Sequence, residues 1–425
     1  MSVSEIPTTQ QTENAGQTKP GRKALLFLMV MAFFNTMGMT IVGPVVPFMT
    51  LSHLSSPNDL ALVVTWMAAS YAICQMIAAP GLGLLSDRFG RKPILFICLL
   101  GSAIGYLLFG LGGALWILFL GRIIDGLTGG NFSVLFGYLA DITEPEERGK
   151  YFGMVGGVSG AGFMVGPAIG GLLANISYST PFLVSAGVIT LTIIWGYFFL
   201  PESLNKENRV KAIRVSDLNP LKQMGVVFRL ARLRWTLLAG FFYYFPFAML
   251  ISLLTILMKD SLGWNATQAG LMGTTVGVVD IITQGILVGK LLKIFGDVKL
   301  SIGSLILVAC SYVVIGAVAF IPSPILLICG VILFAGAGGL VENALRGLTS
   351  RLAEANEQGR VSGAGQSLSS LAMILGPLLG GVAYTQWGHF ETYSSGALFI
   401  VLAMVSVGMA VPALRRHKEE IEAGA

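Results

Sequence analysis

Long apolar runs separated by short polar breaks constrain this chain more than any other feature of its sequence. A bilayer core about 30 Å thick needs roughly 20 apolar residues in a helix, and the 425 residues contain twelve such runs. The runs begin near Ala24, Leu60, Pro93, Ala114, Tyr151, Pro181, Trp235, Thr267, Ser301, Ser323, Ser362 and Thr392. The sequence therefore predicts an all-α membrane protein with twelve transmembrane helices.

Composition argues against a soluble enzyme. Charged residues make up 12% of the chain, whereas an ordinary soluble domain has about 25%. The four cysteines lie inside apolar runs without metal-ligand spacing, and the three histidines are scattered singly. No phosphate-binding GxxxxGK[ST] loop is present. We therefore expect no enzyme activity, no metal and no cofactor, and any energy for transport would come from an ion gradient.

The basic residues predict how the chain is oriented in the membrane. If the chain crosses the membrane twelve times, 24 of its 27 Lys and Arg residues lie on the side that carries both tails, and Lys259 alone lies on the other side. The remaining two, Arg122 and Arg346, lie within or at the ends of apolar runs. Basic residues favour the cytoplasmic side. Both termini are thus expected in the cytoplasm, with the protein in the cell membrane. The net charge of +5 then reflects topology, and no nucleic-acid partner is predicted.

An internal repeat divides the chain into two halves. Gly166-Pro167 in the first half matches Gly376-Pro377 in the second, at an offset of 210 residues. Six spans on each side of a polar, basic linker predict two pseudo-symmetric parallel repeats. The expected segments are a cytoplasmic tail (1–23), a six-helix bundle (24–200), a cytoplasmic linker (201–234), a second six-helix bundle (235–414) and a cytoplasmic tail (415–425).

Three motifs point to a known family. Span 4 carries an RxxxG pattern at Arg122 and Gly126. A glycine-rich and charged loop joins spans 2 and 3, at Gly83, Asp87, Arg88, Gly90, Arg91 and Lys92. Span 5 carries a glycine series with one proline, at Gly162, Gly166, Pro167, Gly170 and Gly171. With these motifs the chain resembles the major facilitator superfamily, and within it the twelve-span drug/proton antiporters that include tetracycline efflux proteins.

The resemblance implies a role for two of these motifs. The charged loop between spans 2 and 3 is expected to hold the cytoplasmic gate shut in the outward-open state, and a static loop anchor is the alternative. The glycines of span 5 recur every four residues, which lets another helix approach closely, while Pro167 removes one backbone hydrogen bond. Span 5 is accordingly expected to gate or seal the transporter, with ordinary helix packing as the alternative.

Charged residues inside the spans are candidates for proton coupling, because a charge in the bilayer is costly and normally serves a purpose. Arg122 and Asp125 lie three residues apart on one helix. They either form an internal ion pair or let Asp125 load and release a proton as the pairing changes. Asp280 has no cation close in sequence and is expected to bind a proton or a cationic drug. Glu342 can reach Arg346, which leaves a functional role and a structural pair equally open.

Three positions depart from the tetracycline-exporter pattern. Asn35 and Cys310 replace acids expected in spans 1 and 9, and Asp280 replaces a histidine in span 8. An amphipathic cargo other than tetracycline itself is therefore expected. The residues expected to line the substrate cavity are Asn35, Gln284, Tyr243, Tyr244 and Phe245. Contact with lipid is the alternative for the aromatic ones.

Together these features predict a secondary active transporter. We expect a monomer that exports a small amphipathic or drug-like compound in exchange for protons, by alternating access of its two halves. A proton-coupled or facilitative importer of a metabolite is one alternative. A non-transporting membrane sensor is another, although the tails are too short for a soluble output domain.

Overall fold

A computed structural model describes residues 22–144, 147–210, 232–353 and 358–424. The first half contains α1 (Arg22–Ile41), α2 (Val46–Leu51), η1 (Pro57–Asp59), α3 (Leu60–Phe89), α4 (Arg91–Leu111), α5 (Leu115–Leu127), α6 (Asn131–Ile142), α7 (Arg148–Leu173), α8 (Thr180–Phe199) and η2 (Lys206–Asn208). The second half contains α10 (Arg234–Leu262), α11 (Ala266–Ile282), η4 (Thr283–Leu287), α12 (Val288–Ala317), α13 (Pro324–Leu352), α14 (Gln358–Gln386) and α15 (His389–Gly424). The described residues form helices and no strands, as the apolar runs predict. The linker predicted at 201–234 and the first tail lie largely outside the described residues.

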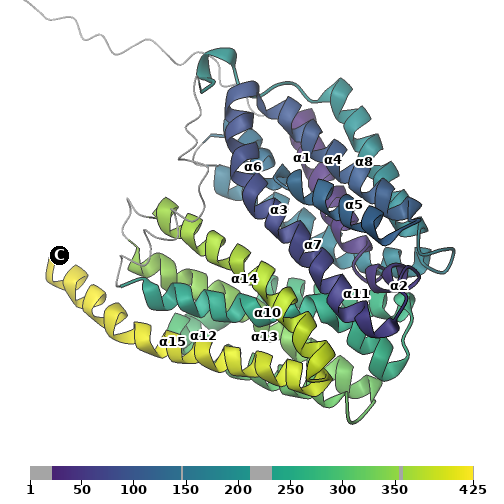
Figure 1. Cartoon of the computed structure of the whole chain (residues 1–425). Helices are drawn as coiled ribbons and strands as arrows, with labels where there is room; N and C mark the ends of the chain where they lie inside the picture. Colours follow the sequence, from purple (N-terminus) through teal and green to yellow (C-terminus); the bar gives the residue numbers. More distant parts are fainter. Residues whose placement is uncertain (1–21, 145–146, 211–231, 354–357, 425) are drawn as a thin grey trace, which may run out of the picture.

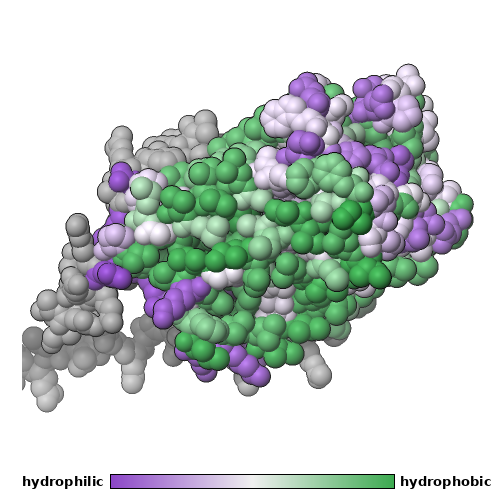
Figure 2. Space-filling view, turned by 90° about the horizontal axis from the view of Figure 1, so that it is seen from below, coloured by the Kyte–Doolittle hydropathy of each residue, from purple (hydrophilic) through white to green (hydrophobic). Residues whose placement is uncertain are grey.

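Apolar side chains cover the outside of the bundle as well as its core. Phe198 is 74% exposed and Ile325 is 73% exposed. Figure 2 shows a broad hydrophobic band on the face seen there, with hydrophilic residues gathered toward the ends. Such a continuous apolar surface is far larger than soluble proteins expose. The chain is a multi-pass membrane protein.

Ten stretches in the described residues are long and apolar enough to cross a membrane, and the predicted number was twelve. One difference is span 4, which consists of two shorter helices, α5 and α6. The other is the stretch Ala266–Ala317, whose 52 residues would form a helix about 78 Å long if straight. The chain turns sharply at Gly296, where φ is 69°, so span 8 passes into span 9 at this residue with no loop between them. The two counts are therefore consistent.

The break between α5 and α6 is held by α3. The Gln75 side-chain amide donates hydrogen bonds to the Gly129 carbonyl at 3.0 Å and to the Tyr71 hydroxyl at 3.2 Å. A methyl group added at Gly126 would lie 2.6 Å from the Tyr71 carbonyl oxygen, so this close packing requires glycine. Irregular backbone inside a membrane needs such partners, because lipid offers none. The break in span 4 is thus stabilised by its contacts with α3.

The two halves lie side by side and meet at one end of the bundle (Figure 1). We call this the far end; it is where α7 ends and α11 begins. There the Thr267 hydroxyl donates a hydrogen bond to the Gly171 carbonyl at 2.8 Å, and Gly381 of α14 packs on Thr65 of α3. We call the opposite end the basic end; it is where α3 turns into α4 at Gly90.

The halves separate toward the basic end. Four glycines of α7 face open space among the described residues: Gly149, Gly153, Gly156 and Gly157. A methyl group added at any of them would have no described atom within 4 Å, apart from the neighbouring backbone of α7 itself. The structure is therefore closed at the far end and open at the basic end.

Candidate transport cavity

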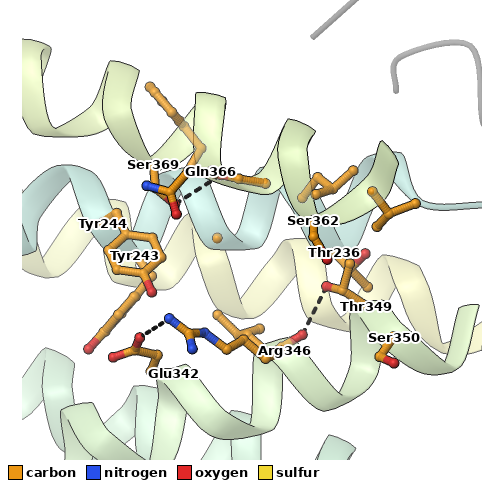
Figure 3. A pocket seen from close by; sticks show the side chains of 16 residues that line it. Thr236, Tyr243, Tyr244, Glu342, Arg346, Thr349, Ser350, Ser362, Gln366 and Ser369 are labelled. Carbon is orange, nitrogen blue, oxygen red and sulfur yellow. Dashed lines mark hydrogen bonds and ion pairs between the residues drawn. The ribbon is translucent and has the colours of Figure 1, made fainter. Parts of the chain in front are cut away.

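A cavity of about 480 Å³ lies between the two halves. The first half contributes residues of α1, α2, α3 and α5, and the second contributes residues of α10, α13 and α14. A second cavity of about 450 Å³ is formed by α10, α13 and α14 alone and runs past Thr236 and Ser362 toward the basic end (Figure 3). Both cavities are lined by Tyr244, Glu342, Arg346, Gln366 and Ser369.

Glu342 and Arg346 form an ion pair in the wall shared by the two cavities. Their closest atoms, Oε1 and an arginine Nη2, are 2.5 Å apart, and the side chains are 31% and 73% exposed. The residues are four positions apart on α13, which places them on one helix face. The reach of Glu342 to Arg346 is as the sequence predicted, and Tyr243 and Tyr244 lie beside the pair (Figure 3).

Arg122 lines the central cavity from the first half. Its guanidinium carbon lies 5.3 Å from the Phe109 ring centre and 6.0 Å from that of Tyr71. No residue that the structure describes accepts a hydrogen bond from Arg122 or forms an ion pair with it within 4.0 Å. The internal ion pair with Asp125 is therefore not formed in this conformation.

Asp125 points away from the cavities into the first half. Its side chain is buried, and Oδ1 accepts a hydrogen bond from the Ser102 hydroxyl of α4 at 2.7 Å. The close approach of α4 depends on Gly105, where an added methyl group would lie 2.9 Å from the Asp125 Cβ. The structure thus separates two side chains that the sequence places on neighbouring positions.

Asp280 is held by Gln284. The Gln284 amide nitrogen donates to both carboxylate oxygens of Asp280, at 2.9 and 2.8 Å. Gln284 belongs to η4, a π-helical segment, and such segments are frequent at functional sites. From α13, Gly339 approaches so closely that an added methyl group would lie 3.0 Å from Asp280 Oδ1. The site therefore depends on α11, η4 and α13 together.

Two of the five predicted cavity residues line a cavity, and the other three make contacts elsewhere. Tyr244 lines both cavities and Tyr243 lines the second one, where the Tyr243 hydroxyl also donates to the Gly338 carbonyl at 3.2 Å. Three others line neither of these two cavities: Asn35 accepts a hydrogen bond from Asn131 at 2.7 Å, Gln284 holds Asp280, and Phe245 stacks on Phe399. The aromatic stretch of span 7 thus divides between the cavity and the packing of the second half.

The charged loop between spans 2 and 3 is tied to other parts of the first half. Arg91 forms ion pairs with Asp87 at 2.5 Å and with Asp141 of α6 at 3.0 Å. The Glu202 carboxylate accepts hydrogen bonds from the backbone N–H groups of Arg91 at 2.8 Å and Lys92 at 3.2 Å. An acid at a helix N-terminus fills unpaired donors and matches the helix dipole.

Other members of this loop make fewer contacts. Arg88 lies over the ring of its neighbour Phe89, and among described residues nothing comes within 4 Å of a methyl group added at Gly83. Gly90 adopts φ of 109°, which a residue with a side chain rarely tolerates. The loop is thus anchored through Arg91 and Lys92 while one side of α3 remains open.

The glycines of span 5 serve two different contacts. Methyl groups added at Gly162 and Gly166 would lie 2.6 and 2.9 Å from the carbonyl oxygens of Phe33 and Met37 in α1, and Gly170 packs on the same helix. Gly171 instead faces Ala266 at the start of α11, in the other half. Close helix approach follows from the spacing, while the identity of the partners comes from the structure.

Several lining residues were not predicted from the sequence. Gln366, Ser369 and Ser370 of α14 line the central cavity, as does Gln75 of α3. The sequence contained a signal for the α14 residues, because polar residues three or four positions apart in an otherwise apolar span lie on one helix face.

The comparisons with known proteins decide the family. The family model described as Major Facilitator Superfamily matches residues 28–245 and 236–424. The chain belongs to the major facilitator superfamily. Membership establishes a membrane transporter rather than an enzyme, as the sequence predicted.

Relatives of this superfamily member include resistance proteins from two bacteria. Tetracycline resistance protein, class C, of Escherichia coli is 33% identical over 92% of this chain and 96% of its own. Multidrug resistance protein 2 of Bacillus subtilis (strain 168) is 28% identical over 88% of this chain and 92% of its own. The crystal structure of the peptide transporter POT shares the fold, with a TM-score of 0.75 at 15% identity over 93% of this chain and 97% of its own.

Proposed function

We propose that this protein exports small amphipathic, drug-like compounds in exchange for protons, by alternating access of its two halves. The observation that supports this most directly is the central cavity, which is lined by both halves and sealed at the far end only. A cavity that both halves enclose changes shape when they move, which is what alternating access requires. Similarity to tetracycline and multidrug resistance proteins supports export of drug-like compounds.

The basic end is the cytoplasmic side in this proposal. The positive-inside tendency supports that orientation, and it places the open cavity where an exporter takes up its cargo. The protein would then reside in the cell membrane with both termini in the cytoplasm. One copy of the chain encloses the cavity, which supports a monomer as the transporting unit, and a proton gradient would supply the energy without a cofactor.

Asp125, Asp280 and Glu342 are the proposed proton carriers. Asp125 and Asp280 are each held by one neutral side chain, Ser102 and Gln284, and no cation lies within 4.0 Å of either among the described residues. A carboxylate that lacks a cationic partner in a membrane is costly to keep charged, so each is suited to carry a proton. Glu342 differs, because it lies in the cavity wall and has Arg346 as its partner.

The test uses inside-out membrane vesicles whose lumen has been acidified by respiration. Ethidium and norfloxacin are added, and proton release is followed with a pH-sensitive fluorophore. We expect release with the wild type, and its loss in Asp125→Asn or Asp280→Asn protein that still reaches the membrane. Asp59→Asn is the matched control, since Asp59 is exposed in η1 outside the long helices, and it should behave as wild type.

One result would contradict export: the absence of proton release with any added compound while radiolabelled metabolites enter whole cells that carry the protein. A different result would reject the carriers and leave export standing. It is proton release that is unchanged in both Asp variants and in the Asp125→Asn/Asp280→Asn double variant, because then neither of these two proposed carriers takes part.

A further inference from the structure

One side of α11 and η4 carries a row of exposed apolar residues. Their exposed fractions lie between 39% and 54%, and they follow one another at intervals of seven, four and four residues: Leu271, Val278, Ile282 and Ile286. Such intervals place side chains above one another along a helix. The other sides of α11 are occupied, because α7 packs on it at Gly277 and α13 approaches it at Asp280. The row therefore faces the lipid.

Two lysines continue this row toward the basic end. Lys290 and Lys293 follow Ile286 by four and seven residues, and both are exposed. Neither forms an ion pair or a hydrogen bond with a residue that the structure describes. Lys92 of the first half differs, because its Nζ donates to the Tyr197 carbonyl at 3.0 Å. The two lysines of the second half are thus available to an anion from outside the protein.

The internal repeat shows why Lys293 has no acidic partner. At an offset of 206 residues, Lys293 stands where the first half has Asp87, and Asp297 stands where it has Arg91. Asp87 and Arg91 form an ion pair. Asp297 is instead paired with Arg351, at 2.6 Å. The signs are inverted between the halves, and the acid of the second half is already neutralised by another residue.

The row and its two lysines match the dimensions of a phospholipid. An α-helix rises about 22 Å over the fifteen residues from Leu271 to Ile286. One half of a bilayer core is about 15 Å thick. Lys290 and Lys293 lie about 6 and 10 Å further along the helix. An acyl chain can therefore lie along the apolar row while its phosphate lies beside the ammonium groups.

The charge of the two lysines distinguishes between lipid headgroups. An anionic headgroup offers them a net negative charge, whereas phosphatidylethanolamine carries an ammonium group that compensates its own phosphate. A lysine near an anionic lipid surface contributes about a fivefold preference, and two lysines contribute about thirtyfold.

We propose that the second half binds one anionic phospholipid on the lipid-facing side of α11 and η4, with the phosphate held by Lys290 and Lys293. The site is separate from both cavities, since neither lysine lines them, and it does not depend on what the protein exports. In the orientation proposed above it lies in the cytoplasmic leaflet, which contains anionic lipids. The corresponding place in the first half carries Asp87, which would repel such a headgroup.

Competition between two lipids with the same acyl chains tests the site. Purified, delipidated full-length protein is incubated with equimolar dioleoyl phosphatidylglycerol and dioleoyl phosphatidylethanolamine, and the bound lipids are quantified by native mass spectrometry. We expect a preference of about thirtyfold for phosphatidylglycerol. Glycerophosphoglycerol, which has the headgroup without acyl chains, should not displace the bound lipid.

The variants assign the preference to the two lysines. Lys290→Gln/Lys293→Gln should bring it close to one, and Lys293→Gln alone should leave about fivefold. Lys290→Arg/Lys293→Arg keeps both charges and should keep the preference. Lys150→Gln/Lys206→Gln is the matched control, because it removes two exposed lysines of the first half at the same end of the protein, and it should behave as wild type.

Four results would overturn the proposal. The first is equal binding of the two lipids by the wild type. The second is a control variant that lowers the preference as much as the Lys290→Gln/Lys293→Gln variant, because the effect would then come from the general positive charge of this end. The third is loss of the preference in the arginine variant. The fourth is displacement of the lipid by glycerophosphoglycerol, which would indicate a site for a free anion.

Discussion

Two adjacent glycines of α7 face different halves of the protein, so the same substitution should have two different effects. A methyl group added at Gly171 would lie 2.7 Å from the Ala266 carbonyl oxygen and 2.9 Å from the Thr267 Cα, both in the second half. One added at Gly170 would lie 2.7 Å from the Ile41 carbonyl carbon, in the first half. Backbone atoms cannot turn aside, so each methyl group must push two helices apart.

The magnitude follows from the cost of overpacking, which is about 1–3 kcal/mol per site. In Gly171→Ala this cost falls only on the state that is closed at the far end. It should raise the ratio of far-end-open to far-end-closed molecules by about fivefold to a hundredfold, since about 1.4 kcal/mol is tenfold. In Gly170→Ala the cost falls on every state, because α1 and α7 stay together within their half, and the protein should lose stability instead.

Spin labels at Ile176 and Trp387, both exposed beyond the far-end termini of α7 and α14, report the separation of the halves by pulsed electron resonance. The four native cysteines are first replaced by serine. Gly171→Ala should add a population at longer distance, and Gly170→Ala should lower the thermal unfolding temperature without changing the distance distribution.

Gly156→Ala is the matched control, because no described atom outside its own neighbouring backbone lies within 4 Å of the added methyl group. It should not increase the long-distance population. If Gly171→Ala and Gly170→Ala gave the same loss of stability and the same distances, the contact at Gly171 would not be a gate between halves, and the reasoning would be refuted.

Two further substitutions test the fixed parts of the first half. Glu202→Gln weakens the cap on the backbone N–H groups of Arg91 and Lys92, and should lower the free energy of unfolding by about 1 kcal/mol; an unchanged thermal transition would contradict the cap. Gln75→Leu leaves the Gly129 carbonyl without its donor, at a cost of about 1–3 kcal/mol. Faster amide hydrogen exchange at residues 126–131 should follow, and unchanged protection would show that Gln75 does not hold the break.

The sequence predicted what depends on spacing along one helix. Apolar run lengths located the spans, and the four-residue spacing of Glu342 and Arg346 predicted their contact, which the structure contains. Residues three apart also lie on one helix face, which placed Asp125 beside Arg122, yet the two side chains point in different directions. Positions three apart on a helix differ by about 60° in direction. Asp125 turns toward Ser102, whereas Arg122 turns toward the cavity.

Contacts between helices were beyond prediction, because nothing in a single sequence states which helix will be the neighbour. The spacing of Gly162, Gly166 and Gly170 predicted a close helix partner, but only the structure identifies it as α1. Gln284 illustrates a second limit. Gln284 lies four residues after Asp280, a spacing that already places both side chains on one helix face, but α-helical periodicity gives no sign that a π-helical turn begins at Thr283.

The contact between α7 and α11 follows one antiparallel register. The contact begins where Gly171 meets Thr267. It ends at Gly160, where an added methyl group would lie 4.0 Å from the Ile281 side chain. The next segment of the second half is η4, at Thr283–Leu287, where the helix widens. The contact between the halves thus stops where the regular α-helix stops.

Small residues continue on both sides beyond that point. If the same register continued, Gly285 would lie across from Gly156, and Gly289 would lie across from the position before Gly153; none of these four glycines has a described atom near an added methyl group outside its own neighbouring backbone. Glycine in a membrane helix is favoured where another helix comes close, which none does here. A transporter must contain in one sequence the packing surfaces of both its states. We therefore expect these empty glycine faces to meet when the basic end closes, and the glycine pattern of span 5 then describes two conformations, of which this structure is one.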